Sequence, residues 1–68
     1  MKEITYEDWQ KNPTPRMMWV WNDDEKEKEK EKEKVVDVYS EEFYKYPVTV
    51  EVVEDRIFET YRHCAEIE

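Results

Sequence analysis

The sequence contains no glycine and no leucine, and its only cysteine is Cys64. Phosphate-cradling loops need glycine where the backbone approaches the ligand, so the usual nucleotide-binding loops are excluded. A lone cysteine cannot form an internal disulfide, which favours a reducing compartment. There is also no apolar run of the roughly 18 residues that a membrane span needs, and no apolar N-terminal stretch typical of a signal peptide. We therefore expect a soluble protein of the cytoplasm, with no membrane partner.

The apolar residues that are present favour strands. The chain of 68 residues has eight Val, three Ile, five Tyr, three Trp and two Phe. Side chains that are β-branched or aromatic suit a pleated, half-buried surface. A chain of this length makes one small domain, residues 1–68, and buries only about 60% of the surface that it exposes when unfolded.

The charge is strongly negative and unevenly distributed. The net charge is −8, yet the run from Glu25 to Lys34 consists of five Glu-Lys pairs and is neutral. Removing five residues of each sign from 11 basic and 19 acidic ones leaves six bases against fourteen acids. Such a surface repels nucleic acid and attracts basic proteins, so we expect a protein partner and no nucleic acid.

A short helix is predicted near the N-terminus. Thr5 can cap it, with Glu7 and Asp8 in the first turn, where the helix dipole favours acids. Pro13 ends it, which gives a helix over about residues 6–11. A helix this short must dock its apolar residues, Ile4 and Trp9, on something larger.

Four strands are predicted after the helix, over residues 17–21, 35–39, 46–53 and 56–65. The first is apolar on both faces, because Met17, Trp19 and Trp21 alternate with Met18 and Val20. The expected fold class is mainly β (α+β): a short N-terminal helix followed by a four-stranded antiparallel meander sheet or a small, partly open barrel.

The last hairpin has a preferred register. A turn at residues 54–55 places Val52 opposite Ile57 and Val48 opposite Tyr61. One face then collects Val48, Val50, Val52, Ile57, Tyr61 and His63. A slip by one residue would bring Arg62 onto the valine face.

Residues 23–34, the charged Glu-Lys segment, are predicted as a solvated loop between the first and second strands. In a helix, the attractive and repulsive pairs along the run nearly cancel. In a strand, one face would be all Glu and the other all Lys. A helix capped by Asn22 is the alternative to the loop.

The sequence supports no catalytic, cofactor-binding or metal-binding residues. His63 and Cys64 are the obvious base and nucleophile, but neighbours on a strand point to opposite faces. Asp23, Asp24 and Glu25 lack the glycine of a calcium loop. We expect a protein that is not an enzyme and needs no cofactor.

Aromatic residues are the candidate protein-binding residues. A small sheet with one helix covers only one of its faces well, and exposed Trp and Tyr residues dominate protein interfaces. The alternative is a barrel that encloses them all. The candidates are Trp19, Trp21, Tyr39, Tyr44 and Tyr46.

Four stretches resemble parts of small, functionally unassigned accessory proteins encoded by phages and prophages of gut-type bacteria: residues 12–24, 35–36, 46–48 and 61–67. The resemblance covers most of the chain outside the Glu-Lys run, which is longer here than the charged turn expected in such proteins. It implies an accessory protein of a mobile element that acts in the cytoplasm of a bacterial host cell, and it lends no site residues.

Together these observations predict a non-enzymatic, acidic, phage-type accessory protein that binds a host protein. An inhibitor of host defence or of nucleic-acid-handling machinery fits, because the basic grooves of such proteins attract an acidic surface. The alternative is a self-assembling structural protein whose aromatic face is buried in a homodimer.

Overall fold

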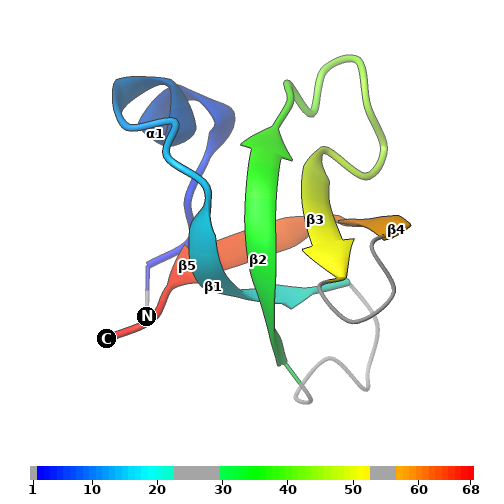
Figure 1. Cartoon of the computed structure of the whole chain (residues 1–68). Coiled ribbons are helices and arrows are strands. Elements are labelled where there is room, and N and C mark those ends of the chain that lie inside the picture. Colours follow the sequence, from blue (N-terminus) through cyan, green and yellow to red (C-terminus); the bar gives the residue numbers. More distant parts are fainter. Residues whose placement is uncertain (1, 23–29, 53–56) are drawn as a thin grey trace.

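Five antiparallel strands form one open sheet, and a short helix precedes them (Figure 1). The computed structural model describes residues 2–22, 30–52 and 57–68. The mainly β prediction is confirmed, with five strands in place of four. The sheet order is β4-β3-β2-β1-β5. The elements are α1 (Tyr6–Lys11), β1 (Arg16–Trp21), β2 (Glu31–Val38), β3 (Val48–Val52), β4 (Ile57–Tyr61) and β5 (His63–Glu66).

The helix α1 has the predicted bounds, and local chemistry explains them. The Asp8 amide donates to Thr5 Oγ1 over 3.2 Å, and the Thr5 amide donates to Asp8 Oδ2 over 3.1 Å. This capping box satisfies two amides at the start of the helix. The bond from the Thr5 backbone is the main reason that the pKa of Asp8 is lowered. Trp9 anchors the helix in the core, as expected.

Strand β1 separates its side chains as its alternation predicts. Met18 and Val20 are fully buried on the inner face of the sheet. Trp19 and Trp21 are half-buried on the outer face, and Met17 on that face is exposed. The barrel that encloses all the aromatic residues is therefore not formed.

Strand β2 begins earlier than predicted. It starts at Glu31, so the loop assigned to residues 23–34 is wrong for its last four residues, and residues 23–29 lie outside the described part. Glu31 pairs with Val20 on the inner face, whereas Lys32 pairs with Trp19 on the outer face. The Glu-Lys alternation has the period of a pleated strand, and β1 supplies a partner for each face. That tertiary pairing decides between strand and loop.

A bulge bends β2 near its end. The register with β3 shifts between Val35 and Asp37, so that Val35 pairs with Val50 and Val38 pairs with Val48. An extra residue increases the local twist of a strand. Both Val35 and Val38 face the core as a result.

The register predicted for the last hairpin is confirmed. Val52 pairs with Ile57 and Val48 with Tyr61. β3 itself is shorter than predicted, because Tyr46 and Pro47 precede it. Val48 and Val50 are buried.

The single final strand predicted over residues 56–65 is wrong, because the chain breaks at Arg62. The Arg62 amide donates to Asn22 Oδ1 over 3.0 Å instead of continuing a strand ladder. The chain then pairs with β1 as β5. His63 consequently lies opposite Trp21 on the outer face, not on the valine face as predicted, and Cys64 lies opposite Val20 in the core.

This break shows how far the sheet is curled. β4 and β5 are the two ends of the sheet order, yet only Arg62 separates them in the chain. The two edges must approach each other at that point, as Figure 1 shows. The core lies inside the curl and consists mainly of Trp9, Met18, Val20, Val35, Val38, Val48, Val50 and Cys64.

Candidate protein-binding surface

The five predicted binding residues fall into two groups that differ in exposure. Trp19 and Trp21 lie on the outer face of β1 and are covered by the chain's own cations. Lys32 Nζ is 4.9 Å from the centroid of the Trp19 ring, and Lys30 Nζ is equally close to Trp21. The His63 ring also stacks on Trp21, with centroids 5.4 Å apart. Both indoles are half-buried, and part of each ring is already in contact with a side chain of the same chain.

The second group lies on the segment from Tyr39 to Pro47, which joins β2 to β3 and is called the aromatic loop below. Tyr39, Tyr44 and Tyr46 are all exposed, and Tyr44 is 51% exposed. Phe43, at the turn of this loop, is 77% exposed, the largest value among the large apolar residues described. Several exposed aromatic residues on one segment are typical of protein interfaces.

Backbone hydrogen bonds hold the aromatic loop in a defined conformation. The Tyr39 amide donates to the Pro47 carbonyl over 2.8 Å and closes the base of the loop. The amides of Phe43 and Tyr44 both donate to the Ser40 carbonyl, at 3.0 and 3.1 Å. The rings of Tyr39 and Tyr44 contact each other, with centroids 4.9 Å apart. A partner would therefore meet a preorganised surface, which reduces the entropy lost on binding.

The aromatic loop also carries charged residues, and a hollow lies beside it. Glu41 and Glu42 precede Phe43, and Lys45 lies over the Tyr46 ring. A hollow of about 300 Å³ separates the loop from the N-terminal segment and the chain break at Arg62. Its walls combine Tyr39, Glu41 and Pro47 of the loop with residues on the other side, Glu3, Ile4, Thr5, Tyr6, Arg62 and His63.

Phe43 is a member of this surface that the sequence pattern did not indicate. Phe43 stands among Glu42, Tyr44 and Lys45, in a stretch without the alternation of a strand. The one available signal was its position between two predicted strands, where an apolar residue has no core to enter. The structure adds it to the three tyrosines.

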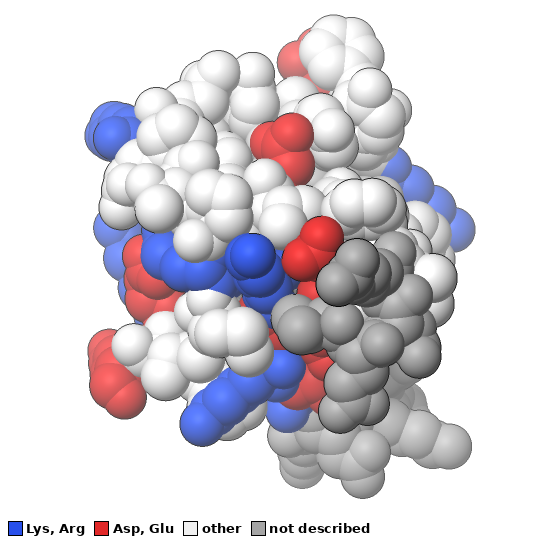
Figure 2. Space-filling view, in the orientation of Figure 1, with Lys and Arg blue, Asp and Glu red and all other residues white. Residues whose placement is uncertain are grey.

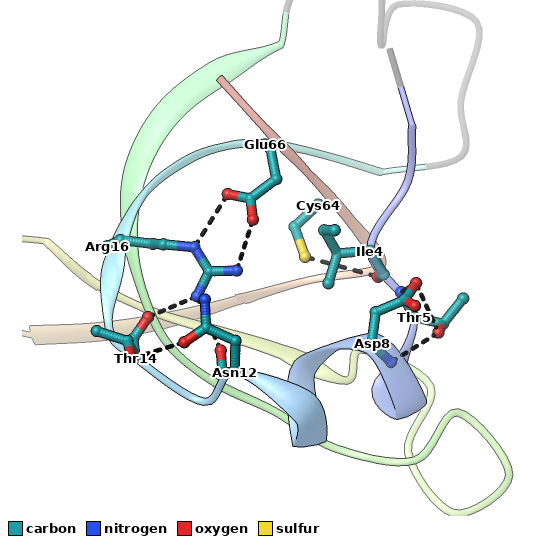
Figure 3. A network of polar contacts seen from close by, with 8 residues as sticks. All are labelled: Ile4, Thr5, Asp8, Asn12, Thr14, Arg16, Cys64 and Glu66. Carbon is teal, nitrogen blue, oxygen red and sulfur yellow. Dashed lines mark hydrogen bonds and ion pairs between the residues drawn. The ribbon is translucent and has the colours of Figure 1, made fainter. Parts of the chain in front are cut away.

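A second missed residue is Arg16, which holds distant parts of the fold together (Figure 3). Its guanidinium donates from Nε and Nη2 to both oxygens of Glu66, over 2.9 and 2.7 Å. Nη1 donates to the carbonyls of Asn12 and Thr14. The same group lies 5.1 Å from the Trp9 ring centroid. The bidentate bond lowers the pKa of Glu66, and the role of Arg16 is structural.

His63 and Cys64 do not form a catalytic pair. They face opposite sides of β5, as predicted for neighbours on a strand. Burial raises the pKa of the Cys64 thiol to about 12, so the thiolate that a nucleophile needs is scarce at neutral pH. His63 Nδ1 lies 2.5 Å from Glu3 Oε2. Among the residues that the structure describes, no group of three or more His, Cys, Asp or Glu side chains could hold a metal ion.

Acidic side chains gather around Tyr61 at the end of β4. Its hydroxyl donates to Glu31 Oε2 over 3.1 Å. Partial burial, followed by that bond and by the negative charges of Glu31, Glu59 and Glu33, raises the pKa of Tyr61 to about 12. The region between the start of β2 and the end of β4 therefore carries a negative potential.

Positive side chains gather elsewhere. Figure 2 shows Lys and Arg side chains across the middle of one face, with uncharged and acidic ones between them. Lys32 and Lys34 project from the outer face of β2, Lys30 directly precedes this strand, and Lys34 Nζ is 3.9 Å from Glu51 Oε1. Lys30 and Lys32 thus contact indole rings, and Lys34 contacts a carboxylate.

No helix in the described ranges is both long and apolar enough to cross a membrane. Comparisons with models of protein families, with curated proteins and with solved structures find no match.

Proposed function

We propose that this chain is a non-enzymatic acidic accessory protein, of the phage type suggested by its sequence, that binds a basic protein of a bacterial host cell through the aromatic loop. The observation that carries the proposal is the exposure of Tyr39, Phe43, Tyr44 and Tyr46 on one hydrogen-bonded loop. Burying four aromatic rings supplies contact energy, and a small domain has no other evident reason to leave them in water.

Charge supplies the preference for a basic partner. The chain carries a net charge of −8, and Glu41 and Glu42 stand directly beside Phe43. A negative field accelerates association with positive surfaces and repels nucleic acid. Host defence proteins and nucleic-acid-handling proteins present basic grooves of this kind, so an inhibitor that occupies such a groove is the proposed mode of action.

Trp19 and Trp21 have a lesser part in this proposal. Lys30 and Lys32 already lie over their rings, so a partner would first have to displace these cations. The same contacts weaken the alternative of a homodimer built on the β1 tryptophans.

The experiment is a binding assay with purified cationic proteins of the host, using the wild-type chain and a Phe43→Ala, Tyr44→Ala double variant. Removing two interface anchors weakens binding by roughly 30-fold or more, and raising the salt concentration weakens it further. Met17→Ala is the matched control, because Met17 and Tyr44 are both 51% exposed and lie on different parts of the surface.

Equal binding by the double variant and the Met17→Ala control would contradict the proposal. So would binding that does not respond to salt. Sedimentation of the free protein tests the homodimer: a dimer that persists at high salt and is lost in Trp19→Ala would favour self-assembly instead.

A further inference from the structure

The two edges of the sheet differ in their cover. On β5, the Ile4 amide donates to the Cys64 carbonyl over 2.8 Å, and Glu3 forms a bridge with Ala65. The N-terminal segment thus protects that edge. On β4, the described part of the chain contains one pairing partner, β3, and nothing pairs with the opposite edge.

The side chains of β4 are also unlike those of a protected edge. Ile57 is 50% exposed and Phe58 is 65% exposed, and they point to opposite faces. Natural edge strands discourage further pairing with lysine, proline or a bulge. β4 has no lysine, proline or bulge, its one charged residue is Glu59 on the same face as Val50, and its four residues from Ile57 to Thr60 are exposed.

We propose that β4 accepts an extended strand from the basic partner protein, antiparallel to β4, with an arginine or lysine opposite Glu59. This inference rests on the proposed function for the sign of the partner's charge. The incoming strand adds backbone hydrogen bonds along β4, and its side chains cover Ile57 and Phe58 on the two faces.

The charge on β4 argues against a second copy of the chain as the occupant. A two-fold antiparallel pairing centred on the strand sets Glu59 against its own copy, which is destabilising. Centring it on Phe58 instead sets Ile57 against Glu59. Glu31 and Glu33 add to the negative potential near the strand end, as their effect on the pKa of Tyr61 shows. A basic residue opposite Glu59 removes this conflict.

The strand site and the aromatic loop are continuous. Arg62 directly follows β4, and its guanidinium lies 5.8 Å from the centroid of the Tyr46 ring. Val48, the first residue after the aromatic loop and the first of β3, pairs with Tyr61 at the end of β4. One partner could therefore contact the loop with a folded surface and β4 with an extended segment.

The test uses a synthetic peptide, acetyl-Val-Thr-Arg-Val-Val-amide, titrated into the isotope-labelled full chain and followed by amide NMR. In the antiparallel register its arginine lies opposite Glu59 and its valines lie opposite Phe58, Ile57 and Tyr61. We expect shift changes and slowed amide exchange in β4. A peptide with Glu in place of Arg should bind roughly fivefold more weakly, and Glu59→Lys should reverse that preference.

A copy of the peptide that is N-methylated at alternate residues separates strand pairing from simple charge attraction, because it keeps the side chains and loses backbone donors. Equal binding by this copy, or shift changes confined to elements other than β4, would overturn the proposal. So would protection of β4 amides by self-association of the free protein. The Phe43→Ala, Tyr44→Ala variant should bind the peptide like the wild type, so failure here and failure of the loop proposal are distinguishable.

Discussion

The two edge strands of this sheet are consecutive in the chain, yet the N-terminal segment covers β5 and no described segment covers β4. β5 lies between β1 and the N-terminal segment, and Cys64 and Ala65 within it are fully buried. β4 leaves Ile57 and Phe58 half or more exposed. Ile57 and Phe58 are larger apolar residues than Cys64 and Ala65, yet they are the exposed ones. The difference teaches that exposure here depends on which segment returns to cover an edge, not on residue type.

The largest expected effect is a loss of stability when the N-terminal segment that pairs with β5 is changed. Ile4 packs against the core, so Ile4→Thr should lower the free energy of unfolding by about 2 kcal/mol. Ile57→Thr makes the same chemical change on the open edge and should cost less than about 0.5 kcal/mol. Urea denaturation followed by Trp fluorescence measures both.

Thiol labelling provides a local readout of the same variants. In the wild type, Cys64 is buried and its raised pKa leaves it as an unreactive thiol. Ile4→Thr should speed its reaction with a disulfide reagent, because the N-terminal segment opens more often. If Ile57→Thr accelerates labelling as much as Ile4→Thr, the distinction between the two edges is lost.

The next effect concerns the ion pair between Arg16 and Glu66 at the end of β5, called the clamp. Glu66→Gln removes the charge that Arg16 holds in a bidentate bond and should cost about 1 kcal/mol at neutral pH. The folded pKa of Glu66 lies below its ordinary value of 4.5. The clamp's contribution is therefore full above pH 4.5 and is lost as the pH falls through the folded pKa. The stability difference between the wild type and Glu66→Gln should shrink on acidification, and a constant difference would refute this assignment.

The smallest effect concerns the outer face next to β5. Lys32→Gln removes the cation over Trp19 and should cost about 0.5 kcal/mol, with greater quenching of Trp fluorescence by iodide. Lys34→Gln is the matched control, because Lys34 contacts Glu51 at 3.9 Å and has no indole beneath it in the strand register. Equal quenching in both variants would show that Lys32 does not cover the indole.

Local patterns were sufficient for several elements. The Thr5 and Asp8 spacing predicted α1, since a capping box involves only neighbours in the chain. Alternation in β1 predicted which side chains share a face, and the structure shows that the face with Met18 and Val20 is the buried one. The register of Val48 with Tyr61 followed from the turn and from the separation of valines and charges.

Patterns failed where a distant segment decided the outcome. Lys32 lies in a strand because it pairs with Trp19 of β1 and its ammonium group lies over the indole ring. The Glu-Lys run alone favours no regular structure. The chain breaks at Arg62 because Asn22, 40 positions away, accepts its amide hydrogen bond. For the candidate surface, the three tyrosines are exposed as expected, whereas Phe43 was missed and the tryptophans are half-buried beneath lysine side chains.

The amino-acid sequence by itself determined the mainly β class, the capped helix, the division of β1 into two apolar faces and the negative charge, because these depend on composition and on neighbours in the chain. Tertiary structure alone decided which edge is covered, which aromatic rings meet water and where the last strand divides. Those outcomes depend on contacts between segments far apart in the chain, and side-chain periodicity carries no information about which distant segments meet.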